Sequence, residues 1–215
     1  MRSASWRSPS AQRTHSSGVV RVFFFFIVRV EDSVGERMAT SSNAPLLVVI
    51  TGAPAAGKTT IARGIAQRLR LPLIAKDTIK EALFDGLGTG DLAWSQRLGV
   101  GTYLAIVALL EDSIAAGASV VVEANFVRGS EIEARLAALP ARFVQVHCTA
   151  PLEVLLERYG RRERHPGHVD GERIEALRDA VESGRHDPLD LPGKTIRLDT
   201  SQEIDIGDVV ARIGA

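Results

Sequence analysis

The chain has a single cysteine, Cys148, among its 215 residues. A disulfide within the chain needs two cysteines and a cysteine-rich zinc module needs more, so the sequence excludes both. A lone thiol suits a reducing compartment, and we therefore expect the protein to be cytoplasmic.

An excess of charge of one sign is missing as well, and aromatic side chains are few. Lysines and arginines number 26, aspartates and glutamates 26, and aromatic residues make up 5% of the chain. A neutral chain has no overall attraction to nucleic acid or to a membrane surface. Few aromatics also disfavour the stacking platforms that hold single-stranded nucleic acid. We therefore expect neither nucleic acid nor membrane as a partner, and the oligomeric state is not indicated.

Residues 1–44 differ from the rest of the chain, because they are rich in arginine and serine and have no acidic residue before Glu31. Their apolar run, residues 19–30, is too short to span a bilayer and is interrupted by Arg21. Three interpretations follow: a targeting peptide, a membrane-associating tail, or sequence upstream of a true start at Met38.

We favour the start at Met38, because a short polar leader follows it directly before the first predicted strand. No small-residue cleavage site follows the apolar run closely, which disfavours a signal peptide. We therefore expect residues 1–44 to be a disordered or non-native extension and residues 45–215 to form one domain.

From residue 45 onward, strand patterns alternate with helix patterns. Such alternation predicts an α/β fold with a parallel sheet covered by helices on both faces, and ligands bind such sheets beyond the carboxyl ends of the strands. Thr78 and Glu81 match a capping box at the start of the second helix. The predicted strands are 46–51, 73–75, 119–123, 143–148 and 195–198, and the predicted helices are 58–69, 78–83, 92–116, 130–139, 152–162, 172–183 and 204–213.

The loop after the first strand matches the Walker A pattern G-x-x-x-x-G-K-[ST] at every fixed position. Its small residues let successive backbone N–H groups surround a phosphate, and Lys58 adds a full charge at the β- and γ-phosphates. The Thr59 hydroxyl is placed to bind Mg²⁺. We expect this loop to bind a nucleoside triphosphate through Gly52, Ala53, Pro54, Ala55, Ala56, Gly57, Lys58, Thr59 and Thr60.

Asp77 follows the second predicted strand, where a carboxylate would face the γ-phosphate. It is our candidate catalytic base, which would accept the proton of a substrate hydroxyl or orient that hydroxyl for in-line attack. The structural alternative is that Asp77 only caps the short helix near Thr78.

Glu123 ends the third predicted strand and is our candidate second anchor for Mg²⁺. The alternative is an ordinary solvated acid at the end of a strand. We also expect residues 84–94, a segment with three glycines, to line the pocket of the phosphate acceptor.

Four arginines lie within seven residues after the fourth strand. A short lid made of them would bring guanidinium groups onto the transferred phosphoryl group and exclude water. Arg158 together with Arg161 or Arg162 is best spaced to point the same way from one helix, and Arg158 and Arg162 are our candidates for that catalytic role. The alternative is a solvated basic helix end. No N-K-x-D segment of the kind used for guanine is present, which favours ATP over GTP.

Four segments together resemble the small P-loop kinases gathered as AAA-type ATPase-like or zeta-toxin-like phosphotransferases: GAPAAGKTT, KDTIKEALFD, VVEANF and ERYGRRERHPGH. That group includes chloramphenicol phosphotransferase and the kinase domain of polynucleotide kinase. The resemblance implies a five-stranded parallel sheet of order 2-3-1-4-5, a base at Asp77, and phosphate contacts from Arg158 and Arg162. The sequence departs from the group's pattern at Glu123, where a paired Asp-Asp or Asp-Glu is usual.

The predicted function is transfer of the γ-phosphoryl group of Mg·ATP to a hydroxyl of a small molecule, so ATP and Mg²⁺ are the expected cofactors. Two alternatives stay open: a kinase for the 5′-hydroxyl of polynucleotides, and an ATP-binding or ATPase module that acts as a switch.

Overall fold

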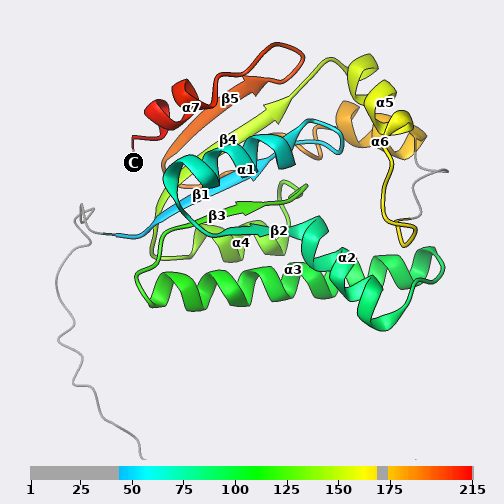
Figure 1. Cartoon of the computed structure of the whole chain (residues 1–215), viewed down its shortest axis with the longest axis horizontal. Helices are drawn as coiled ribbons and strands as arrows, with labels where there is room; N and C mark the ends of the chain where they lie inside the picture. The colour runs from blue at the N-terminus through cyan, green and yellow to red at the C-terminus, as the bar shows by residue number, and fades with distance from the viewer. Residues whose placement is uncertain (1–43, 169–173, 215) are drawn as a thin grey trace, which may run out of the picture. The chain divides into compact units, whose positions relative to one another are not determined.

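A computed structural model describes residues 44–168 and 174–214 (Figure 1). The prediction of an N-terminal extension therefore lies outside the described residues, except for Ala44. The first two residues of the predicted helix 172–183 also lie outside them.

The described residues form one five-stranded parallel sheet of order β2-β3-β1-β4-β5, which confirms the predicted fold class and strand order. In the register, Ile50 pairs with Glu123 on one side and with Val146 on the other. The ends of β1 and β3 therefore lie side by side. The strands are β1 (Leu46–Thr51), β2 (Leu73–Ala75), β3 (Val120–Glu123), β4 (Arg142–Thr149) and β5 (Lys194–Asp199).

Helices cover both faces of this sheet, as Figure 1 shows. One face packs against α1 (Lys58–Leu69), α5 (Leu152–Arg161), α6 (Ile174–Glu182) and α7 (Ile206–Ile213). The other packs against α3 (Leu92–Ala115) and α4 (Glu131–Ala137), and α2 (Lys76–Leu87) contacts α3. Strand β1 sends Val48 and Ile50 into one core and Leu47 and Val49 into the other. Burial on both faces explains its unbroken apolar sequence.

Among the described residues, α3 is the one helix long and apolar enough to cross a membrane. Its residues Ile106, Leu110 and Ile114 are buried against the sheet in the second core. A core helix of a globular domain passes the same test of length and composition, so this finding is weak evidence for a membrane span.

Helix α2 differs from its prediction at both ends. It begins at Lys76, directly after β2, and its N-cap is Ala75 without a side-chain bond, so the predicted capping box of Thr78 and Glu81 is wrong. The segment from Asp85 to Leu87, predicted as loop, is the last turn of the helix. Glycine in a helix costs about 1 kcal/mol relative to alanine. Burial of Phe84, which is 1% exposed, offsets that cost at Gly86.

Candidate functional site

The loop between β1 and α1 has the backbone that its glycines predict. Gly52 has a φ of 132°, and a Cβ at this position would lie 2.0 Å from the carbonyl oxygen of Cys148 in β4. Only glycine fits so close to a neighbouring strand. Gly57 precedes α1 with a φ of 72°, and α1 begins without a side-chain cap. The first backbone N–H groups of this helix are therefore directed at the loop, as in anion sites at helix N-termini.

Lys58 is the first residue of α1 and is buried, with its Nζ donating to the carbonyl oxygen of Ala53 at 2.7 Å. Burial lowers the pKa of Lys58, while the nearby Glu123 carboxylate opposes that shift. The lysine thus curls back over its own loop, where its charge would meet the phosphates of a bound nucleotide.

Glu123 ends β3 beside this loop, and its Oε2 accepts from the Thr59 hydroxyl at 3.3 Å. Burial raises the pKa of Glu123, and the charge of Lys58 works against the rise. A hydroxyl and a carboxylate side by side are the oxygen donors that Mg²⁺ prefers, and Mg²⁺ needs few protein ligands because phosphates and water supply the rest. Thr59 and Glu123 therefore fit the cation predicted from the sequence.

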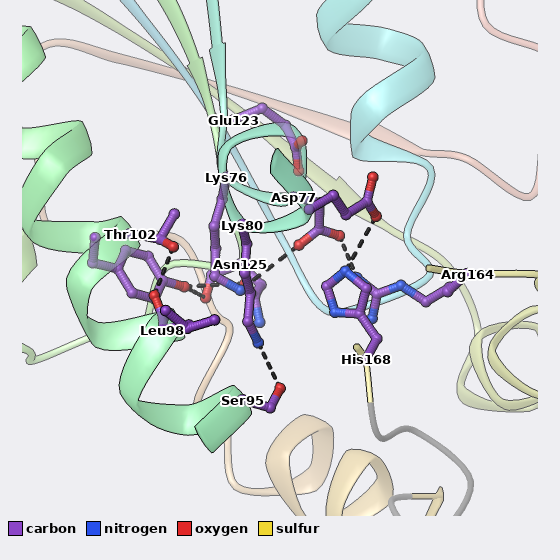
Figure 2. A network of polar contacts seen from close by, with 12 residues as sticks. Lys76, Asp77, Lys80, Ser95, Leu98, Thr102, Glu123, Asn125, Arg164 and His168 are labelled. Atoms are coloured by element: carbon purple, nitrogen blue, oxygen red, sulfur yellow. Dashed lines mark hydrogen bonds and ion pairs between the residues drawn. The ribbon is translucent and has the colours of Figure 1, made fainter. Parts of the chain in front are cut away.

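Asp77 lies in the first turn of α2, at the carboxyl end of β2. Its Oδ2 accepts from Arg164 at 2.5 Å, and Lys76 lies 3.8 Å from its Oδ1, as drawn in Figure 2. Burial alone would raise the pKa of Asp77, but the Arg164 guanidinium and other nearby cations outweigh it and hold this pKa below its ordinary value. Asp77 is therefore an ionised carboxylate at neutral pH.

One cavity of about 730 Å³ brings the predicted residues together. Lys58, Thr59, Asp77 and Glu123 all line it, and so do the predicted arginines. Of the predicted nucleotide-binding residues, those along its wall are Pro54, Ala55, Gly57, Lys58, Thr59 and Thr60.

The arginines of the predicted lid have different surroundings. Arg158 donates to the carbonyl oxygen of Thr200 at 2.8 Å and to its hydroxyl at 3.1 Å, beside Gly57 of the loop. The Arg162 guanidinium lies 4.4 Å from the centre of the Tyr159 ring. Arg161 is exposed and pairs with Glu157. Arg158 and Arg162 thus line the cavity, whereas Arg161 lies on the surface.

Arg164 is the arginine that reaches Asp77, and sequence reasoning did not single it out. Helix α5 ends at Arg161, so Arg164 belongs to the segment of residues 162–168, which we call the basic arm. The arm lies along α2: His168 Nε2 is 3.1 Å from Glu81, and His165 Nε2 is 3.1 Å from Asp85. Acidic residues four positions apart share one face of a helix. The spacing of Glu81 and Asp85 in the sequence could therefore have indicated that this face of α2 binds the basic arm.

Residues of α2, α3 and the loop after β3 also line the cavity, where the phosphate acceptor was predicted to bind. None of residues 84–94 lines it, so that prediction is wrong, because the longer α2 carries them past the opening. Instead, Ser95, Gly99 and Tyr103 of α3 line this part of the cavity. The Tyr103 hydroxyl donates to the Asn125 carbonyl oxygen at 2.9 Å. Burial raises the pKa of Tyr103, so its hydroxyl keeps its proton.

Two lysines of α2 also line this side, and both were missed as site residues. Lys80 is 7% exposed, and its Nζ donates to the Ser95 hydroxyl at 2.9 Å. Lys76 lies over the Tyr103 ring, 5.2 Å from the centre. The two lysines are four residues apart and share one face of α2, because the helix begins at Lys76. A helix that began at Thr78, as predicted, would not have contained Lys76, so the prediction did not place the two lysines together.

Comparison with known proteins agrees with this geometry. A family model described as an AAA domain matches residues 47–183. A crystal structure from Chloroflexus aurantiacus, provisionally described as a kinase, is 36% identical, with a TM-score of 0.72 over 80% of this chain and 97% of that chain. A sugar kinase from a Janibacter species is 20% identical, with a TM-score of 0.53 over 79% of this chain and 91% of that one, which shows the fold alone.

A comparison of the chain with proteins of curated function found no match. The family model covers well over half of the chain, and its span includes the nucleotide loop, Asp77, Glu123 and the basic arm. The chain therefore belongs to the AAA domain family, in its P-loop kinase-like form.

Proposed function

We propose that the protein is a kinase that transfers the γ-phosphoryl group of Mg·ATP to a hydroxyl of a small molecule. The observation that carries this proposal is that the phosphate-binding loop and the ionised carboxylate of Asp77, in the first turn of α2, line the same cavity. A phosphate loop alone would suit any nucleotide-binding protein. A carboxylate facing it is what a transfer to a hydroxyl requires.

Each residue has one task in this proposal. The loop amides and Lys58 bind the β- and γ-phosphates, and Thr59 and Glu123 hold Mg²⁺, which would neutralise charge on those phosphates. Asp77 accepts a hydrogen bond from the acceptor hydroxyl, which directs an oxygen lone pair at the γ-phosphorus and gives the proton a place to go. Arg158 and Arg162 stabilise charge on the transferred group.

The nucleotide is ATP in this proposal. Thr200 lies beside Gly57 and accepts from Arg158, so the loop after β5 adjoins the phosphate site, where a purine would follow. This loop carries no N-K-x-D segment of the kind that selects guanine.

Asp77→Asn tests the proposal. The exchange keeps the shape of the side chain and removes its charge, so phosphoryl transfer falls by about 100-fold or more while binding of an ATP analogue is kept. Transfer is measured as ADP formation with acceptors found by thermal shift among sugars, nucleosides and aminoglycoside-like antibiotics. Asp85→Asn, on the same helix but outside the cavity, is the matched control.

Three results would contradict the proposal. Undiminished transfer by Asp77→Asn would remove Asp77 from the chemistry. ATP hydrolysis that no acceptor stimulates would favour the switch or ATPase alternative, and transfer to a 5′-hydroxyl oligonucleotide in preference to every small molecule would favour the polynucleotide kinase.

A further inference from the structure

We infer that two copies of this chain pair through the outer face of α3, with the two helices antiparallel about a two-fold axis that passes between Leu104 and Ala105. The pairing does not depend on the proposed function, because it concerns the side of α3 that is turned away from the sheet. In Figure 1, α3 runs along the lower edge of the drawn helices, with the sheet above it.

Helix α3 is more apolar than its burial within the chain explains. Its length and composition would suit a membrane span, yet only 33% of its most apolar stretch of 18 residues is buried. Leu104 and Leu109 are 49% and 46% exposed. Val100 is exposed as well, but it lines the cavity. Single exposed leucines are ordinary, whereas a continuous apolar face indicates an interaction surface.

The exposed residues of α3 form such a continuous face. Residues three or four positions apart are neighbours on the surface of a helix. A fully exposed row with this spacing runs along the outer side of α3, apolar in its interior and charged at each end. Its interior has two small residues, so a second helix can approach closely. The row consists of Arg97, Gly101, Leu104, Ala108 and Asp112, and Ala105 and Leu109 lie on its flank.

The charges at the two ends of the row determine the orientation of a second copy. Arg97 lies seven residues before Leu104, and Asp112 lies seven residues after Ala105. In a two-fold contact the same surface is used twice, so a residue that meets another in one copy is met by it in return. The antiparallel pair therefore brings Arg97 of each copy to the level of Asp112 of the other. A parallel pair would place like charges together.

Both charges are available for this contact. Glu111, beside Asp112, pairs with Arg135 of α4 at 2.7 Å. Among residues 44–168 and 174–214, by contrast, no ion pair involves Asp112 or Arg97. The Arg97 guanidinium lies 5.4 Å from the centre of the Trp94 ring of its own helix, which holds it at the surface. The apolar row thus has an unused cation at one end and an unused carboxylate at the other.

The size of the row predicts a weak dimer. Its 16 positions extend over about 24 Å of helix. One pair of helices covers less than the roughly 800 Å² per partner of a standard interface, so we expect a dissociation constant of roughly 10–100 μM. A membrane is the other occupant that an apolar helix face could have. Glu111 and Asp112 border the row, and an anionic lipid surface would repel them.

Sedimentation equilibrium of the full chain, at concentrations on both sides of the expected constant, tests the pairing. Leu104→Glu places two like charges beside the axis at an exposed position, so it should weaken association by about 100-fold or more. Binding of an ATP analogue should be unchanged, which shows that the variant is folded. Leu87→Glu changes a leucine that is exposed at the end of α2, outside the row, and should associate as the wild type does.

A charge reversal tests the orientation. Arg97→Glu or Asp112→Arg alone puts like charges together at both ends of the contact, so each should weaken association by about tenfold. The two changes combined restore both pairs with reversed sign, and association should return to within about threefold of the wild type. A general effect of charge on solubility would not produce this recovery.

Disulfide cross-linking gives a second measure of the orientation, because the natural Cys148 is buried and does not compete. Ala105→Cys lies beside the axis, so the two copies of its thiol meet and should cross-link on mild oxidation. Ala93→Cys is also exposed, but its two copies lie about 35 Å apart along an antiparallel pair. A disulfide needs Cα atoms within about 7 Å, so Ala93→Cys should stay uncross-linked.

A chain that remains monomeric at every concentration would overturn the inference. A dimer that Leu104→Glu leaves intact would do the same, as would a charge reversal without recovery. Cross-linking of Ala93→Cys as readily as Ala105→Cys would rule out the antiparallel arrangement. Finally, a monomer that sediments with phosphatidylglycerol vesicles, and no longer does so as Leu104→Glu, would assign this face to a membrane instead.

Discussion

The guanidinium of Arg164 lies 2.5 Å from a carboxylate oxygen of Asp77, across 87 positions of sequence. The pair joins the basic arm to the first turn of α2 and keeps the candidate base ionised. The Asp77 side chain is still 41% exposed, so the pair leaves part of the carboxylate open to the cavity.

Removing the Arg164 charge should make Asp77 easier to protonate. In Arg164→Met, the pKa of Asp77 rises toward and beyond its ordinary value, because burial then acts with less opposition. The acidic limb of the pH profile of kcat/KM moves to higher pH, with roughly a two- to tenfold loss on that limb. Arg161→Met, which removes a surface arginine of the same segment, should keep the wild-type profile. An unmoved limb in Arg164→Met would show that Asp77 is not the titrating group.

Divalent cation binding should weaken as the pH falls. Burial raises the pKa of Glu123, and a carboxylate must lose its proton before it can bind a metal. Affinity for Mn²⁺, used as a spectroscopic substitute for Mg²⁺ in the nucleotide complex, should therefore fall from neutral pH toward pH 5. Glu123→Gln should bind Mn²⁺ about tenfold or more weakly. Its pH dependence should retain only the titration of the nucleotide phosphates, and a wild-type slope in this variant would exclude Glu123 as a ligand.

Two glycine substitutions should affect two different properties: Gly52→Ala should lower nucleotide affinity, and Gly86→Ala should raise stability. Gly52→Ala places a Cβ 2.0 Å from a backbone oxygen of β4, so the loop must shift and nucleotide affinity should fall by about 100-fold or more. Gly86→Ala lies within α2 with no neighbour inside 4 Å of the added atom. It should raise the free energy of unfolding by about 0.5–1 kcal/mol and leave nucleotide binding unchanged. Isothermal titration with an ATP analogue and urea unfolding separate the two effects.

Stability should depend on pH through His147 in β4. Burial, aided by Arg197, lowers the pKa of His147 from 6.5 to about 4. Between these values the unfolded chain takes up a proton that the folded chain does not, so stability falls as the pH falls from 6.5 to 4. The loss is on the order of 3 kcal/mol.

The comparison of wild type with His147→Phe isolates this contribution. The variant should lose that part of the slope in urea unfolding between pH 6.5 and 4, and the difference between the two curves should be flat above pH 7. Parallel curves throughout the acidic range would show that His147 does not carry the dependence.

The parts of the fold that local sequence determines were predicted closely. The bounds of β1, α1 and β2 agree residue for residue with their predictions, because an unbroken apolar strand, a glycine loop and Pro72 are all local signals. Asp77 and Glu123 lie at the carboxyl ends of β2 and β3, and Lys58 and Thr59 begin the helix that follows β1, so the topology of the sheet brings all four to one cavity.

The part of the cavity wall that α2 and α3 form depends on contacts between distant segments, which local sequence patterns do not reveal. The second helix was predicted to stop before Asp85, but Phe84 is buried and the arm packs along this turn, with the rings of Phe84 and His165 stacked 5.4 Å apart. A cluster of four arginines does not show which of them lie within the helix and which lie beyond its end. Helix α5 ends at Arg161, so Arg164 lies outside the helix and can reach Asp77 of α2.

The three contacts of the arm with α2, at Asp77, Glu81 and Asp85, recur at every fourth residue, or about 6 Å along the helix axis. Along the arm the order is different, because the neighbouring residues Arg164 and His165 contact Asp77 and Asp85, while His168 contacts Glu81 between them. Two adjacent residues of the arm thus span about two turns of α2. The arm is therefore fastened across the helix at several points at once, and the loss of one contact leaves two others to hold it beside Asp77.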